Sequence, residues 1–239
     1  KEEELIQMKQ DENYRREFIG NVSHELKTPI FNIQGYVQTL LDGGLYDENV
    51  NMKYLERTNK SVERMINIVE DLEVISRLET EQSQLDMQSF NITDLVSEVL
   101  EAFEMKASKI NIELSLNNES QSDYVIGDRD KIQQVFMNLV SNSIKYGQEG
   151  GKTTVSFFDM EQNMLIEVSD NGIGIEEDSL DRLFERFYRV DKNRSREIGG
   201  TGLGLAIVKH ILEGHNQTIN VRSTKDVGST FSFILEKGK

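Results

Sequence analysis

The chain has 239 residues, a formal net charge of -15, three histidines and no cysteine. This length suits one large or two modest domains, and the change of pattern along the chain favours two. The lack of cysteine excludes disulfides and thiolate metal sites, and three histidines are too few for a convincing zinc site. The negative charge argues against nucleic acid, whose phosphates are bound by surplus Lys and Arg. A nucleotide must therefore be held by local donors and a metal ion.

The sequence begins with Lys1, and its opening KEEELIQMKQ lacks the apolar core of a signal peptide. No apolar run approaches the roughly 18 residues of a membrane span. We interpret the chain as a piece of a longer protein and expect this piece to make no membrane contact. The preceding part is expected to hold a sensor and an anchor in the inner (plasma) membrane, which leaves this piece in the cytoplasm.

Two amphipathic helices are predicted in the first third of the chain, over residues 2–41 and 51–79. The first carries an apolar residue at every seventh position: Ile19, Leu26, Ile33 and Leu40. Such spacing forms a helical seam, and the short connection predicts an antiparallel hairpin. Two narrow stripes bury little surface, so we expect a homodimer in which two hairpins form a four-helix bundle.

A polar stretch over residues 80–89 interrupts the helical period, and we place a domain boundary there. Residues 1–82 form the helical hairpin domain, with 1–14 as an incoming coiled-coil segment, and residues 83–239 form a second domain. The second domain is predicted to be an α/β sandwich with helices on one face of a mixed sheet. Its expected helices cover 92–107, 128–146 and 203–213, and its expected strands cover 110–116, 153–159, 164–170, 218–223 and 229–235.

The first helix contains His24 within the segment SHELKTP, on the side opposite the seam. A solvent-facing imidazole is largely neutral and nucleophilic near pH 7. Glu25 can manage the proton of the other ring nitrogen, and Thr28 lies one turn further on the same face as His24. Pro29 predicts a kink just past the histidine. A single exposed histidine is more often an ordinary surface residue, so the function depends on its neighbours.

The segment SHELKTP resembles the phosphoacceptor motif of the HisKA class of histidine kinases. The resemblance includes the seam spacing and the hairpin. It implies that His24 is phosphorylated, that Glu25 acts as its base, and that Thr28 serves a phosphatase reaction.

A second cluster of polar residues lies on the predicted helix 128–146. Asn138, Asn142 and Lys145 sit at i, i+4 and i+7 and therefore line one face. Mg²⁺ prefers hard oxygen ligands, and a lysine can meet phosphate oxygens, so this face suits a Mg-nucleotide. Tyr146 follows and can pack on a base or ribose. Such a face is also compatible with an ordinary solvated helix surface.

Two glycine-containing segments follow. DNGIGI starts at Asp170 at the end of a predicted strand, where its carboxylate can accept a hydrogen bond from an exocyclic amine such as that of adenine. GGTGLGLAIVKHI starts at Gly199, and its helix N-terminus can hold phosphate oxygens. It lacks the ending of a P-loop and the placement of a dinucleotide-binding loop. Between the two segments, aromatic anchors and a charged run predict a mobile lid in which Arg189 or Arg194 meets phosphate.

In order and spacing, these segments resemble the ATP-binding domain shared by histidine kinases and the wider GHKL ATPases. The resemblance implies Mg²⁺ binding by Asn142 and Asn138, contacts of Asn138 and Lys145 with phosphates, and Tyr146 beside the adenine. It also implies a hydrogen bond from the adenine amine to Asp170 and a phosphate contact by Arg189. The remaining nucleotide-binding positions that it implies are Gly172, Gly174, Gly200, Gly202, Leu203 and Gly204.

The function that these resemblances imply is ATP-dependent autophosphorylation of His24, followed by phosphoryl transfer to an aspartate of a response regulator that docks on the hairpin. Two other functions, a hydrolytic ATPase and a non-enzymatic module, are alternatives to the kinase. A chaperone-type or mismatch-repair-type ATPase needs an acidic base where this helix has Asn138 and Asn142. A non-enzymatic coiled-coil module would not need intact glycines. His210 and His215 lie outside the motifs, and we expect surface or helix-end roles for them.

Overall fold

The structure is a computed structural model that describes residues 2–80, 85–190 and 200–239. Contacts between residues divide the chain into two compact units: residues 1–74 with 199–201, and residues 75–198 with 202–239. The predicted domain boundary at 82–83 falls outside the described residues and stays a prediction. Among the described residues, none of the helices combines the length and apolar character that crossing a bilayer requires.

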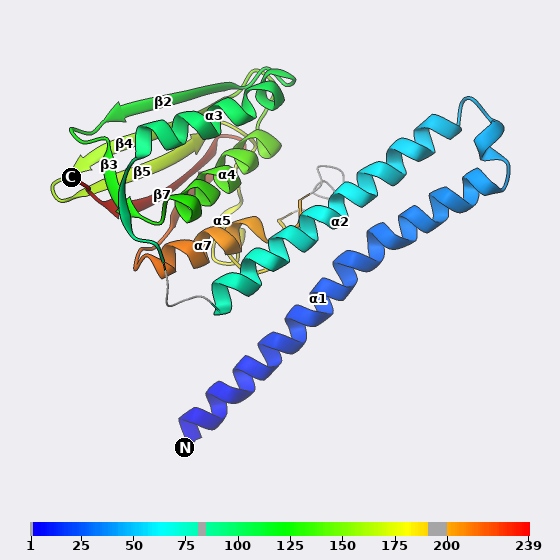
Figure 1. Cartoon of the computed structure of the whole chain (residues 1–239), viewed down its shortest axis with the longest axis horizontal. Helices are drawn as coiled ribbons and strands as arrows, with labels where there is room; N and C mark the ends of the chain where they lie inside the picture. The colour runs from blue at the N-terminus through cyan, green and yellow to red at the C-terminus, as the bar shows by residue number, and fades with distance from the viewer. Residues whose placement is uncertain (1, 81–84, 191–199) are drawn as a thin grey trace. The chain divides into compact units, whose positions relative to one another are not determined.

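The first unit holds a helical hairpin, whose second helix continues from Ile75 into the second unit (Figure 1). Helix α1 (Glu2–Leu41) is followed by a short 3-10 helix, η1 (Gly44–Tyr46), and by helix α2 (Asn51–Thr80), so the predicted ranges are confirmed to within one residue. Gly43 has a φ of 111°, a backbone conformation that favours glycine, and it turns the chain out of α1. Pro29 lies within α1 without ending it.

Aromatic and apolar contacts join the two helices of the hairpin. The rings of Tyr36 and Tyr54 meet edge to face with centroids 5.5 Å apart. Leu40 and Ile68 are buried, but Ile19 remains 64% exposed. In α2, the apolar residues Leu55, Val62 and Val69 recur at every seventh position, and they are likewise 40% to 47% exposed. A single hairpin therefore leaves much of its apolar stripe in contact with water, as the dimer prediction requires.

The second unit is built on a five-stranded sheet in the order β2-β4-β5-β7-β6. The strands are β2 (Glu113–Glu119), β4 (Lys152–Met160), β5 (Asn163–Asp170), β6 (Asn220–Thr224) and β7 (Gly228–Glu236). β2 runs parallel to β4, and the other neighbours are antiparallel. Helices α3 (Ile92–Ser108), α4 (Arg129–Tyr146) and α7 (Gly204–Gly214) cover one face (Figure 1). The predicted α/β sandwich is confirmed.

The core of this unit lies between the sheet and the helices. Alternate residues are buried from Thr153 to Phe157 in β4 and from Met164 to Val168 in β5, as expected for strands with one covered face. Phe136 of α4 and Phe233 of β7 are both 0% to 1% exposed, and their rings lie 5.8 Å apart. This packing fixes α4 on the sheet.

Among the described residues of the second unit, three short elements were not predicted. Strands β1 (Gln88–Asn91) and β3 (Tyr124–Gly127) pair antiparallel as a separate two-stranded sheet, and α5 (Glu177–Leu180) is a single helical turn. The predicted strand 110–116 begins later, at Glu113, because Asn111 has a left-handed φ of 54° in a turn that follows α3.

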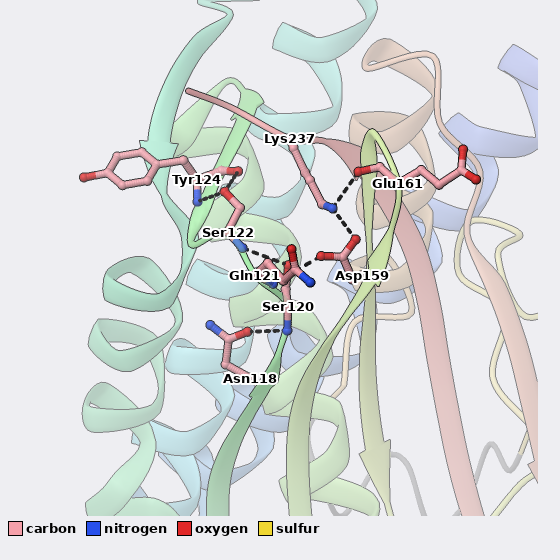
Figure 2. Close-up of polar contacts among 8 residues, drawn as sticks. All are labelled: Asn118, Ser120, Gln121, Ser122, Tyr124, Asp159, Glu161 and Lys237. Atoms are coloured by element: carbon pink, nitrogen blue, oxygen red, sulfur yellow. Dashed lines mark hydrogen bonds and ion pairs between the residues drawn. The ribbon is translucent and has the colours of Figure 1, made fainter.

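A polar network closes the end of the sheet where β4 turns into β5 (Figure 2). Lys237 pairs with the carboxylate of Asp159 and donates to the carbonyl oxygen of Glu161 at 2.6 Å. The backbone N–H of Gln121 donates to the other carboxylate oxygen of Asp159 at 3.2 Å. The Lys237 ammonium holds the pKa of Asp159 below its usual range. These contacts tie the C-terminal residues to the loop between β2 and β3, at the opposite end of β5 from Asp170.

A buried histidine joins the start of α4 to the end of α7. His215 Nε2 accepts a hydrogen bond from the backbone N–H of Asp128 at 3.0 Å, so Nδ1 carries the proton and donates to the carbonyl of Ile211 at 2.8 Å. The carboxylate of Asp128 caps α4 by accepting from the N–H of Lys131 at 3.1 Å. His215 thus has the helix-end role expected of it but is not on the surface, whereas His210 is half-buried on α7.

Replacing His215 with Phe should destabilise the second unit by about 1–3 kcal/mol, because the buried N–H of Asp128 would lose its acceptor. The measurement is the free energy of unfolding from urea denaturation followed by circular dichroism. His24→Ala, which alters an exposed histidine, serves as the control and should leave this value unchanged. Equal unfolding free energies for His215→Phe and the unaltered chain would contradict the anchoring role.

Candidate functional site

The predicted phosphoacceptor segment lies in the middle of α1. His24 is exposed, as its position opposite the seam predicts, while Glu25 and Thr28 are half-buried. The hydroxyl of Thr28 donates to the backbone carbonyl of His24 at 3.3 Å, one helical turn back. Thr28 therefore lies against the turn that carries the histidine.

The carboxylate of Glu25 is held by a residue that the sequence analysis missed. Arg64 of α2 donates from Nη2 to Glu25 Oε2 at 2.7 Å, across the hairpin. The side chains of Arg64 and Glu25 are only 13% and 21% exposed. One sequence signal was present: Arg64 directly precedes Met65, which forms an apolar row with Leu72, seven residues further along this helix.

In the second unit, the polar face of α4 is formed as predicted. Asn138, Asn142 and Lys145 are all half-buried along this helix. Asn138 Nδ2 donates to the backbone carbonyl of Gln134 at 3.0 Å. A Cβ at Gly204 would lie 2.9 Å from the amide oxygen of Asn138, so the glycine at the start of α7 keeps space beside Asn138.

The DNGIGI segment passes directly beside the C-terminal end of α4. Ile173 donates its backbone N–H to the carbonyl of Tyr146 at 3.1 Å. A Cβ at Gly172 would lie 2.4 Å from the same carbonyl oxygen, so only glycine permits this approach. Gly174 has a φ of 62°, and a Cβ there would lie 2.0 Å from the carbonyl oxygen of Thr224. Both glycines are thus required by the backbone path that places the segment next to Tyr146.

Asp170 ends β5 at the beginning of this segment. Its Oδ1 accepts a hydrogen bond from the backbone N–H of Gly172 at 2.9 Å. Burial raises the pKa of Asp170 above its ordinary value of 3.8, and hydrogen bonds from the backbone of Gly172 and Ser229 oppose this rise. The structure therefore places a partly desolvated hydrogen-bond acceptor beside the end of α4.

The second glycine segment leads into α7 and contacts the aromatic anchor of the predicted lid. Phe187 donates its N–H to the carbonyl of Gly202 at 2.8 Å, and Gly202 has a φ of 78°. A Cβ at Gly202 would lie 2.9 Å from the backbone of Phe187. Leu203 is buried at the N-terminus of α7, which has no side-chain cap there. The first turn of a helix directs backbone N–H groups outward from its N-terminus, and such groups can bind an anion.

Two other predicted positions have a described location: Gly200 and Arg189 are each half-buried. Arg194 lies outside the described residues. Within the second unit, the structure brings the polar face of α4, the DNGIGI segment and the start of α7 around one site. Oxygen donors at Asn138 and Asn142, space beside Gly204 and an open helix N-terminus fit a Mg-nucleotide. His24, Glu25 and Thr28 belong to the first unit.

An exposed histidine on a helical hairpin, joined to an α/β sandwich with this site, defines a protein of the histidine kinase type. Family comparisons agree. Residues 14–81 match the "His Kinase A (phospho-acceptor) domain", and residues 127–239 match the "Histidine kinase-, DNA gyrase B-, and HSP90-like ATPase". The chain belongs to the sensor histidine kinases.

Individual relatives extend this likeness over nearly the whole chain. Sensor histidine kinase WalK of Bacillus subtilis (strain 168) is 39% identical over 223 residues, which are 92% of this chain and 36% of WalK. The solved structure of Acinetobacter baumannii histidine kinase AdeS has a TM-score of 0.71 at 31% identity and covers 90% of this chain and 98% of AdeS. Histidine kinase ThkA, solved in complex with response regulator protein TrrA, has a TM-score of 0.74 at 25% identity, over 98% of this chain and 67% of ThkA.

Replacing Asp170 with Asn should raise the free energy of unfolding at pH 7 in the absence of nucleotide. Because the pKa of Asp170 is raised in the folded chain, its ionisation costs stability as the pH rises from about 3.8 through the folded pKa, and the cost persists above it. The gain should therefore shrink as the pH falls toward 3.8. Urea denaturation between pH 3 and 8 measures it.

Asp159→Asn is the matched control, since Lys237 lowers the pKa of Asp159. Its ionised carboxylate contributes stability that is present at neutral pH and is lost as the pH falls through the folded pKa. Asp159→Asn should therefore be less stable than the unaltered chain at pH 7, whereas Asp170→Asn should be more stable. A loss of stability for Asp170→Asn at pH 7 would show that burial does not dominate at Asp170.

Proposed function

We propose that the chain is the catalytic core of an ATP-dependent protein-histidine kinase that phosphorylates its own His24. The observation that carries the proposal is the presence, in one chain, of an outward-facing histidine within SHELKTP and of a nucleotide site built from α4 and two glycine segments. Neither feature alone would separate a kinase from an ordinary surface histidine or from a hydrolytic ATPase.

In the nucleotide site, we propose that Asn142 and Asn138 hold Mg²⁺ through their amide oxygens and that Lys145 contacts phosphate oxygens. Tyr146 lies by the adenine, and Asp170 accepts a hydrogen bond from the adenine amine. Bound Mg²⁺ offsets negative charge on the phosphates.

The glycines of the two segments, Gly172, Gly174, Gly200, Gly202 and Gly204, allow the nucleotide close to the backbone, and Leu203 seats the start of α7. Arg189 supplies further positive charge to the phosphates. Such local charge is needed because the net charge of -15 repels a polyanion.

For the transfer step, a ring nitrogen of His24 attacks the γ-phosphorus of ATP in line. A nitrogen–phosphorus bond forms, the bond from the γ-phosphorus to the bridging oxygen of ADP breaks, and ADP leaves. Glu25 orients the imidazole and accepts the proton from its other nitrogen. The phosphoryl group then passes to an aspartate of a response regulator, and Thr28 serves the reverse dephosphorylation of that regulator.

The proposal includes a second copy of the chain and a response regulator as partners. The exposed apolar stripes of α1 and α2 support a homodimer through the hairpin. The complex of ThkA with response regulator protein TrrA supports a response regulator as a partner, and we propose that its receiver domain docks on the hairpin. The chain spans 36% of the length of WalK, a protein named as a sensor. We propose accordingly that it is the cytoplasmic part of a longer sensor anchored in the inner membrane.

The two other functions are less well supported. A hydrolytic clamp ATPase needs an acidic side chain to activate water, and the matching face of α4 offers the neutral amides of Asn138 and Asn142. A purely structural coiled-coil module gives no reason for Gly172 and Gly202 to make backbone approaches that a Cβ would block.

His24→Gln should abolish acid-labile labelling of the chain by ATP labelled on the γ-phosphate, because the only proposed nucleophile is removed. Binding of Mg-ATP, measured by isothermal titration calorimetry, should remain unchanged, since the nucleotide site lies in the second unit. His210→Gln is the matched control and should keep full labelling. Acid-labile label on the His24→Gln protein would contradict the assignment of the acceptor.

Asn142→Ala should weaken Mg-ATP binding about tenfold to hundredfold, because loss of a contact to a charged group costs about 1.5–3 kcal/mol. Calorimetric titration measures the dissociation constant. Asn163→Ala, at the end of β5 opposite Asp170, is the control and should bind as the unaltered chain does. Equal affinities for Asn142→Ala and Asn163→Ala would remove Asn142 from the nucleotide site.

A further inference from the structure

The ion pair between Glu25 and Arg64 joins the two helices of the hairpin and is largely withdrawn from water, since its side chains are 21% and 13% exposed. Its 2.7 Å distance is that of a charge-assisted hydrogen bond, and its partners are 39 residues apart in sequence. By contrast, the pair Glu12–Arg16 lies on a single helix, and its side chains are 73% and 79% exposed. Exposed ion pairs of that kind contribute little to the stability of the fold. A guanidinium that is sheltered from water can hold the carboxylate that it contacts in one orientation.

The location of this pair gives it chemical significance. Glu25 adjoins His24 in sequence, but consecutive helix positions point about 100° apart. The structure reflects this difference, since His24 is exposed and the Glu25 side chain is 21% exposed and bonded to α2. The carboxylate is therefore positioned by the facing helix. Arg64 Nε is buried and makes no hydrogen bond within the described residues, so Glu25 provides the polar contact that the structure gives this guanidinium.

Resting on the proposed function, we propose that Arg64 is a positioning residue for the phosphoacceptor reaction: it clamps Oε2 of Glu25, and thereby sets the orientation in which Glu25 meets the imidazole proton of His24. Arg64 itself does not contact the reacting atoms in this role. Small errors in the placement of a proton acceptor lower reaction rates strongly, because proton transfer needs hydrogen-bond geometry. Through this contact, helix α2 contributes to a reaction whose nucleophile lies on α1.

The test compares initial rates of His24 autophosphorylation, over a series of ATP concentrations and pH values, for the unaltered chain and for Arg64→Gln, Arg64→Lys, Glu25→Gln and the double variant Arg64→Gln/Glu25→Gln. The matched control is Arg57→Gln. Arg57 also lies on α2 and reaches across the hairpin, where its guanidinium carbon is 6.0 Å from the ring centroid of Tyr36, but no carboxylate contact is described for it.

Arg64→Gln should lower kcat about tenfold to hundredfold and leave KM for ATP unchanged. The loss is smaller than the full contribution of general base catalysis, because Glu25 itself is still present. Arg64→Lys should recover part of the rate because it keeps a positive donor, and Arg57→Gln should keep the rate within about twofold. In the Glu25→Gln background, Arg64→Gln should have no further effect, since residues that act through one another are not additive.

Several outcomes would overturn the inference. Equal effects of Arg64→Gln in the presence and absence of Glu25 would show that Arg64 does not act through this carboxylate. Equal losses in Arg64→Gln and Arg57→Gln, with a lower melting temperature in both, would show a purely structural contribution to the hairpin. An unaltered chain that acquires no label on His24 would refute the proposed function itself, which separates that failure from the failure of the Arg64 assignment.

Discussion

The fixing of helix α4 at both ends is the constraint on which the second unit depends. At its start, Asp128 caps the helix and donates its N–H to the buried ring of His215. At its end, the carbonyl of Tyr146 accepts the N–H of Ile173. Between these points, Phe136 packs into the core against the sheet. The polar face with Asn142 is therefore held rigidly against the two glycine segments, as a site for an oriented ligand requires.

The same arrangement reconciles an acidic protein with a polyanionic ligand. The candidate site offers neutral amides on α4 and backbone N–H groups at the start of α7, and Asp170 is its partly buried acid. Burial favours the neutral form of that carboxyl, so the fold accepts a cost in stability to keep a hydrogen-bond acceptor at the end of β5. Local groups thus decide what the site binds, independently of the net charge.

In the hairpin, the apolar rows and the polar contacts differ in how far they are sheltered from water. Its apolar rows are only partly covered by each other, since Ile19 and Leu55 remain about half or more exposed at 64% and 47%. Its polar contacts include one sheltered ion pair, formed by Glu25 and Arg64 next to the exposed His24. His24, the proposed nucleophile, is exposed to solvent, while Glu25, the residue proposed to accept its proton, is held by the opposite helix.

By itself, the sequence determined the type and order of the long elements, and it placed most of the site residues on them. Helical and strand periods are local properties, because side chains three or four residues apart meet on a helix and alternate on a strand. The ranges of α1, α4 and β5 were accordingly predicted within a few residues. The outward position of His24 and the common face of Asn138 and Asn142 were also predicted.

Only the tertiary structure decided the features that join distant parts of the chain. Strands β1 and β3 are four residues each and show no usable period, so their pairing depends on the packing around them. The contacts of Glu25 with Arg64 and of Asp128 with His215 span 39 and 87 residues. The packing of the whole core decides which faces meet over such separations. A local sequence pattern does not determine these contacts.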